Sequence, residues 1–152
     1  MELLNNFSIE ILWQLFFAAA LGALIGTERE YKRKGAGLQT YSLVALGSCL
    51  FTVVFVTMSS SVDSTGSSTA YESARLIQAI ATGIGFIGAG VIFRQASGPI
   101  GLTTATGLWV VAAIGVAAGF QLYFLAIIVA ILTIAILLGL GRIEEKFFKS
   151  RE

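Results

Sequence analysis

The glycines of TGIGFIGAG, residues 82–90, have the spacing of a phosphate-binding loop. Gly83, Gly85 and Gly88 form G-x-G-x-x-G, which in nucleotide-binding enzymes lets the backbone approach a pyrophosphate. That chemistry needs a preceding strand, a following helix and an acidic residue about 20 positions later. Here the glycines lie inside a long apolar segment, and no Asp or Glu follows Gly88 before Glu144. The pattern therefore does not predict nucleotide binding, and we expect no cofactor.

The ionisable residues that could bind or transfer an ion lie near the ends of apolar segments. They are Glu28, Arg29, Glu72, Arg75 and Arg94, and they are joined by the hydroxyl groups of Thr103 and Thr104. Charged groups inside a membrane are costly and commonly functional, whereas charges at helix ends also serve as anchors. Glu72 and Arg75 can pair across one helical turn. Both interpretations, functional site and helix end, stay open for these residues.

Catalytic and metal chemistry are not favoured. The chain has no histidine and one cysteine, Cys49, which lies in an apolar run. An intramembrane enzyme would need a nucleophile and a base at depth, and no such pair is evident. The sequence therefore predicts no catalytic residues, no metal site and no enzyme, and nothing in it points to nucleic acid as a partner.

The composition indicates an integral membrane protein. Hydrophobic residues make up 56% of the 152 residues and charged residues 12%, against about 25% charged residues in soluble domains. Five segments are long and apolar enough to span a bilayer. They run from about Ser8 to Gly26, Leu38 to Met58, Leu76 to Phe93, Leu102 to Gly119 and Leu122 to Leu140. We therefore predict an all-α domain of five spans over residues 1–141 and a short amphipathic tail over residues 142–152. No signal peptide is expected, because the N-terminus carries Glu2 and Glu10 and no basic residue.

The basic residues predict the orientation in the membrane. Nine of the ten Lys and Arg residues fall on one side of the predicted spans: Arg29, Lys32, Arg33, Lys34, Arg94, Arg142, Lys146, Lys149 and Arg151. The other side carries Arg75. Because positive residues favour the cytoplasm, the N-terminus is expected outside and the C-terminus inside.

The third span divides into a bulky stripe and a small-residue face. Ile77, Ile80, Ile84, Ile87 and Val91 share one stripe, and the other side includes Gly83, Gly85, Gly88 and Gly90. Helices in membranes associate through small residues, so we expect the glycines inside the bundle and the stripe against lipid. A tight core of spans one, three and four is predicted, with span two alongside and a homodimer covering the remaining small-residue faces. The alternative is a helix broken at the glycines, as at transporter binding sites.

Three stretches together resemble the MgtC/SapB family of bacterial inner-membrane proteins. They are GALIGTEREYKRKGAGLQTYSLVALGSCLF, ESARLIQAIATGIGFIGAGVIF and GLTTATGLWVVAAIGVAAG. By this resemblance Glu28 and Arg29 match the family's Glu-Arg pair, and Gln39 departs from a usual Arg in the AGLRT motif. The glycines match the family's glycine signature, and Thr103 and Thr104 match its GLTTA motif. Many members carry a further cytoplasmic domain, which this sequence is expected to lack.

The resemblance implies a multi-pass protein of the bacterial inner membrane, linked to growth at low magnesium and to acid stress. We expect a regulatory or homeostatic role through self-association or other membrane proteins. The alternative is a small ion or solute transporter that uses the glycine-rich third span, with Glu72, Arg75, Thr103 and Thr104 as polar gates.

Overall fold

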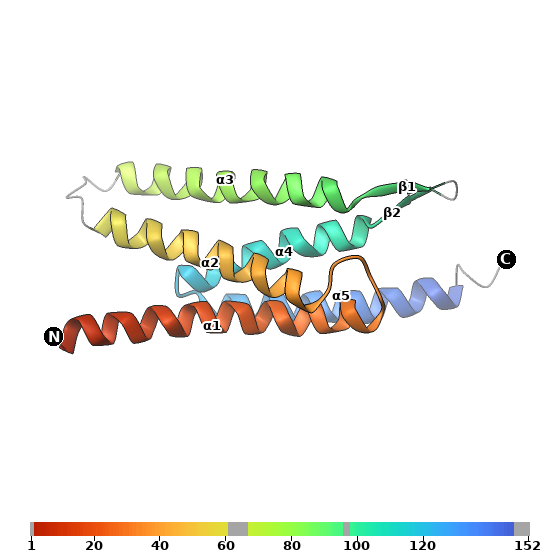
Figure 1. The fold of residues 1–152 in the computed structure, drawn as a ribbon, viewed down its shortest axis with the longest axis horizontal. Helices are drawn as coiled ribbons and strands as arrows, with labels where there is room; N and C mark the ends of the chain where they lie inside the picture. The colour runs from red at the N-terminus through yellow and green to blue at the C-terminus, as the bar shows by residue number, and fades with distance from the viewer. Residues whose placement is uncertain (1, 61–66, 96–97, 148–152) are drawn as a thin grey trace.

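The computed structural model describes residues 2–60, 67–95 and 98–147, which form five helices and one short hairpin (Figure 1). The helices are α1 (Glu2–Tyr31), α2 (Leu38–Ser60), α3 (Ser67–Val91), α4 (Leu102–Gly119) and α5 (Tyr123–Phe147). All five contain a segment long and apolar enough to cross a membrane. The prediction of an all-α membrane protein with five spans is confirmed.

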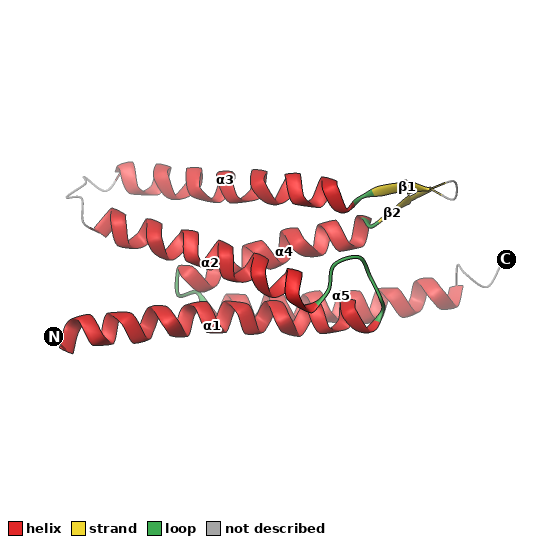
Figure 2. Ribbon diagram, viewed as in Figure 1, coloured by secondary structure: helices red, strands yellow, loops and turns green. Residues whose placement is uncertain are grey.

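The helices differ from the predicted spans mainly at their ends. α1 continues to Tyr31, past the predicted end of the first span at Gly26. The third loop contains a short antiparallel hairpin of β1 (Phe93–Gln95) and β2 (Gly98–Ile100), drawn in yellow in Figure 2. After β2, Gly101 has a φ of 87°, and a Cβ there would collide with the carbonyl of Val91. This glycine therefore lets the hairpin lead directly into α4.

The centre of the bundle is formed by α1, α2 and α4, and α4 lies against every other helix. Small residues allow the close approach. A Cβ atom at Gly22 of α1 would lie 2.5 Å from the carbonyl oxygen of Tyr41 on α2, and a Cβ atom at Gly115 of α4 would collide with the carbonyl of Ala45. Small residues of the first and fourth spans are thus buried between the helices. The predicted core of spans one, three and four is wrong, because α2 takes the central place expected for α3.

The orientation of α3 agrees with the prediction only in part: Gly88 is buried, and Ile77 and Ile87 are exposed, but the other predicted positions are not as expected. Ile84 is 8% exposed and faces the bundle, and Gly88 contacts Ala105 of α4. In contrast, Gly83, Gly85 and Gly90 have no neighbouring atom within 4 Å of a Cβ position. The physical reason is that α4 presents small residues to α3, so that the bulky stripe fits against them. The helix is continuous from Ser67 to Val91, so the alternative of a break at the glycines is not supported.

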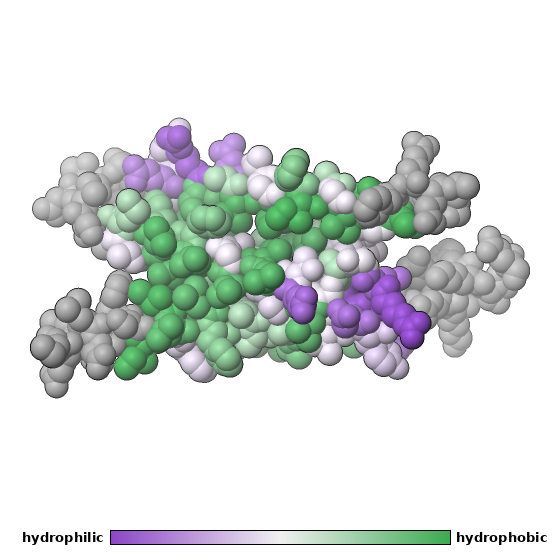
Figure 3. Space-filling model, in the orientation of Figure 1, coloured by the Kyte–Doolittle hydropathy of each residue, from purple (hydrophilic) through white to green (hydrophobic). Residues whose placement is uncertain are grey.

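The remaining surface agrees with a protein embedded in lipid. α4 and α5 form an antiparallel pair through a tight link in which Gln121 has a φ of 62°. α5 packs on α4 and α1 and lies at the edge of the bundle. Figure 3 shows apolar residues over the middle of one face, with hydrophilic residues near the start of α3 and at the α1–α2 corner. Below, the end of the bundle where α1 begins is called the N-terminal end, and the other the C-terminal end.

Candidate functional site

The predicted pair Glu28 and Arg29 is buried near the C-terminal end of the bundle. The side chains are 7% and 4% exposed. Arg29 belongs to the stripe of α1 that faces the other helices. This stripe consists of Gln14, Ala18, Gly22, Ile25 and Arg29, all of which are buried. Since α1 continues past Gly26, the helical period carries Arg29 into the same interior as Ile25.

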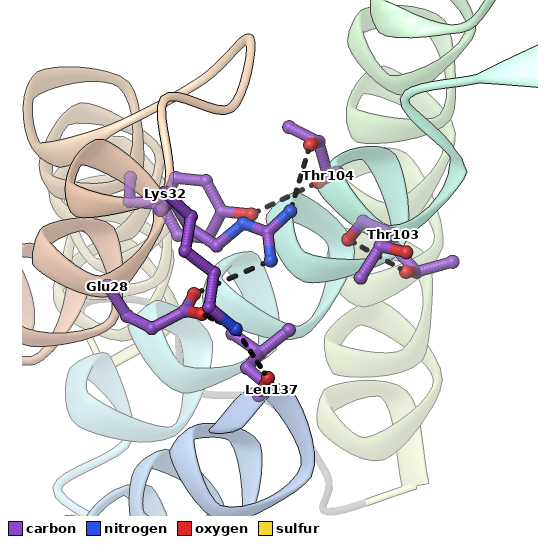
Figure 4. Close-up of polar contacts among 8 residues, drawn as sticks. Glu28, Lys32, Thr103, Thr104 and Leu137 are labelled. Carbon is purple, nitrogen blue, oxygen red and sulfur yellow. Dashed lines mark hydrogen bonds and ion pairs between the residues drawn. The ribbon is translucent and has the colours of Figure 1, made fainter. Parts of the chain in front are cut away.

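These two residues form a polar cluster with Lys32, which directly follows α1, and with Thr104 of α4 (Figure 4). An Arg29 guanidinium nitrogen donates to the Thr104 hydroxyl at 3.3 Å, and the other terminal nitrogen lies 3.4 Å from Glu28. The Lys32 ammonium lies 2.9 Å from the second Glu28 oxygen, and it donates to the carbonyl of Leu137 on α5 at 3.2 Å. The cluster therefore joins α1, α4 and α5. Here it is called the Glu28 cluster.

Tyr41 of α2 adds the fourth helix to the Glu28 cluster. Its hydroxyl donates to the carbonyl of Thr104 at 3.2 Å, and its side chain is fully buried. Gly107 makes room for it, because a Cβ at this position would collide with the Tyr41 hydroxyl. Lys32 and Tyr41 were not predicted as site residues. The four-residue spacing of Glu28 and Lys32 is a signal for the first, whereas the bond of Tyr41 to a backbone carbonyl leaves no trace in the sequence.

The charges of the Glu28 cluster do not balance. One carboxylate faces two cations, so that the cluster carries a formal charge of +1. Two buried atoms have no hydrogen-bond partner within the described residues: the Nε of Arg29 and the Glu28 oxygen that lies 2.9 Å from the Lys32 ammonium. With both carboxylate oxygens in contact with cations, Glu28 is poorly placed to bind a metal cation. The arrangement instead suits a fixed junction between helices, with one spare buried donor.

The other predicted polar residues lie outside the Glu28 cluster. Thr103 is exposed, next to the buried Thr104, and Figure 4 shows it turned away from Glu28 and Lys32. Glu72 and Arg75 are both exposed. The Arg75 guanidinium lies over the ring of Tyr71, 5.9 Å from its centroid, and the ion pairs of the described residues do not include Glu72. Arg94 lies in β1 opposite Pro99, and its side chain is outside the described part of the structure.

A groove of about 700 Å³ runs between α2 and α3 on the outer surface of the bundle. Its lining is mainly apolar and includes Leu43, Gly47, Phe51, Ile80, Gly83 and Phe86. Neither Gly47 nor Gly83 has an atom within 4 Å of a Cβ position. The groove exists because α2 and α3 touch only lightly, while each packs more extensively on α4. It is here called the α2–α3 groove.

Comparison with known proteins gives consistent matches. The sequence model of the MgtC family matches residues 15–146. The chain is 39% identical over 132 residues to the putative magnesium transporter YhiD of Escherichia coli K12, covering 84% of this chain and 59% of that protein. It is 45% identical over 105 residues to the protein MgtC of Salmonella typhimurium 14028s, covering 69% of this chain and 41% of that protein. It thus spans about half the length of these relatives. No solved structure matches it.

Proposed function

The chain belongs to the MgtC family of multi-pass membrane proteins, and we propose that it serves magnesium homeostasis in the bacterial inner membrane as a regulator. In this proposal the protein acts by contact with other membrane helices, with its N-terminus outside and its C-terminus in the cytoplasm. The magnesium link rests on the family and on the printed name of the relative YhiD. The bias of basic residues supports the orientation.

One observation carries the proposed mode of action: α3 is packed on one side only. Gly83, Gly85 and Gly90 have no atom of the described residues within 4 Å of a Cβ position, and the adjoining α2–α3 groove is open. Each glycine lowers the stability of a helix by about 1 kcal/mol relative to alanine. A glycine that faces lipid makes no packing contact that would offset this loss. Close approach of another helix would offset it, because small residues are where membrane helices pack. We take the occupant to be a second copy of this chain.

Crosslinking in native membranes tests this contact. In a Cys49→Ala background, the only native thiol is removed, and a new cysteine replaces Phe86, which is 84% exposed beside the groove. The matched control places a cysteine at Ile136, which is 56% exposed on α5. Oxidation should give a disulfide-linked dimer for the Phe86 variant and little for the Ile136 variant. Equal crosslinking at both positions, or none at either, would contradict self-association through α3.

The second candidate function is transport, which the printed name of YhiD favours. The version that relied on a broken third helix loses its basis, since α3 is continuous. The buried stripe of α1 also has the apolar residues Ala18, Gly22 and Ile25 between its polar ends. Proteoliposomes that contain the purified protein should therefore show no flux of magnesium, sodium or protons above empty vesicles. A saturable magnesium flux would replace the regulator by the transporter.

A further inference from the structure

A second polar site lies at the N-terminal end of the bundle, far from the Glu28 cluster. It is a cavity of about 160 Å³ between α1, the end of α2 and the α4–α5 link. Its polar lining comes from Glu10 and Gln14 of α1, Thr57 of α2 and Gln121 of the link. A cavity of this size has room for several water molecules. It is therefore large enough for a small hydrated ion.

Gln14 shows that the cavity is more than a packing gap. Its side chain is 4% exposed and lines the cavity. None of the hydrogen bonds in the described part of the chain involves its amide. An unbonded amide away from bulk water costs about 1–3 kcal/mol, so a buried Gln normally has a partner. The amide atoms are not among the fully enclosed atoms without a partner in the described residues, so they open into the cavity, where a water molecule or an ion can be their partner.

Glu10 gives the cavity its charge. One of its carboxylate oxygens accepts a hydrogen bond of 2.8 Å from the Gln121 amide nitrogen. This bond lies on the exposed side of the cavity and holds the carboxylate there. Among the described residues that line the cavity, Glu10 is the one charged residue, and none of them is Lys or Arg. The side-chain acceptors are thus all oxygen atoms, around a formal charge of −1.

Oxygen ligands with a negative charge are the preferred environment of hard cations. Magnesium in particular keeps several of its waters and commonly uses one or two carboxylates. We propose that this cavity binds a hydrated divalent cation, with Glu10 as the charged ligand and the Gln14 amide oxygen as a ligand to the ion or its water. One carboxylate gives a weak site, with a dissociation constant on the order of 10⁻³ M. This binding does not depend on how the protein sits in the membrane, and it goes beyond the proposed regulatory contact.

Manganese(II) is a suitable probe, because the electron paramagnetic resonance signal of the free ion disappears on binding. The purified full chain in a neutral detergent should bind Mn²⁺ competitively with Mg²⁺. Glu10→Gln should weaken binding at least tenfold. The matched control is Glu72→Gln, the same change at an exposed site that lies outside the cavity. This control should bind Mn²⁺ as the wild type does.

A stability measurement provides the second readout. At a Mg²⁺ concentration about ten times the dissociation constant, the folding equilibrium should shift about tenfold, and the wild type should melt at a higher temperature than at equal ionic strength in sodium chloride. Gln14→Leu keeps the charge and fills the cavity with apolar atoms, so that it should lose the effect even if Glu10→Gln fails to fold. The proposal is overturned if the wild type binds no Mn²⁺. It is equally overturned if Gln14→Leu or Glu10→Gln responds like the wild type, or if Glu72→Gln loses as much binding as Glu10→Gln.

Discussion

Replacing Glu28 by glutamine should destabilise the bundle much more than removing its nearest cation. Glutamine has nearly the same shape as glutamate, so that the change removes the charge and leaves the packing. Arg29, which is 3% exposed as a whole residue, then becomes a buried cation without a counter-ion. Its contact with Glu28 is 3.4 Å long, and that of Lys32 is 2.9 Å. At an effective dielectric constant near 20, each contact is worth about 5 kcal/mol before desolvation is subtracted.

The net effect follows from burial. Breaking a buried ion pair by removing one partner typically costs about 3–5 kcal/mol, and we expect about 3 kcal/mol for Glu28→Gln. That is a change of about 100-fold in the unfolding equilibrium. Lys32 is 25% exposed, and water screens its charge. Lys32→Met leaves Glu28 balanced by Arg29 and should cost less than about 1 kcal/mol.

The assay is unfolding of the purified protein in mixed micelles with increasing sodium dodecyl sulfate. Glu72→Gln is the control for the same chemical change at an exposed position of α3. The double variant Glu28→Gln with Arg29→Met removes both charges, and it should recover most of the lost stability because the uncompensated cation is gone. The reasoning is refuted if Lys32→Met costs as much as Glu28→Gln, or if the double variant is less stable than Glu28→Gln alone.

The glycines and the tyrosine make further predictions for the same assay. Gly115→Ala should lower the free energy of unfolding by more than about 2 kcal/mol, because the new methyl group would meet a carbonyl of α2. Gly85→Ala lies in open space and should be neutral or stabilising by up to about 1 kcal/mol. Equal losses of stability in the two variants would contradict the placement of α3. Tyr41→Phe removes the buried bond to the Thr104 carbonyl and should cost about 1 kcal/mol, and an unchanged unfolding curve would count against that bond. Gly101→Ala forces a side chain into a φ of 87° against a neighbouring carbonyl, so a loss of at least about 1 kcal/mol is expected, and a fully stable variant would show that the turn is different.

The spans could be predicted because hydropathy sums over about 20 residues and tolerates errors at the ends. The side of α3 that faces the bundle could not be predicted from hydropathy, because lipid and the protein interior are equally apolar. Both sides of α3 suit either environment, and the choice depends on the fit to α4, where Gly88 meets Ala105 and Ile84 on the same face of α3 is buried. This fit depends on α3 and α4 being neighbours, and hydropathy does not reveal which helices are neighbours.

The candidate site was predicted in part, for a similar reason. Glu28, Arg29 and Thr104 were all singled out from the sequence, but as groups at span ends. Their burial depends on α1 continuing to Tyr31, and charged residues in this last turn made the helix look shorter than it is. Once the helix is extended, the spacing of Ile25 and Arg29 by four residues predicts that both face the bundle.

The two polar sites stand at opposite ends of the same stripe of α1. Gln14 and Arg29 are 15 residues apart, which corresponds to about 22 Å along a helix. Between them Ala18, Gly22 and Ile25 are buried, and a Cβ at Gly22 would lie 2.5 Å from a backbone oxygen of α2. No charged side chain belongs to the stripe between Gln14 and Arg29, and charge in an apolar interior is costly, so we expect no ion to cross this stretch. A cation at Glu10 can therefore act on the Glu28 cluster only through the position of α1 as a rigid element. Binding of a divalent cation without flux is the combination that we expect from this geometry, and saturable flux abolished by Glu10→Gln would show that the apolar stretch opens.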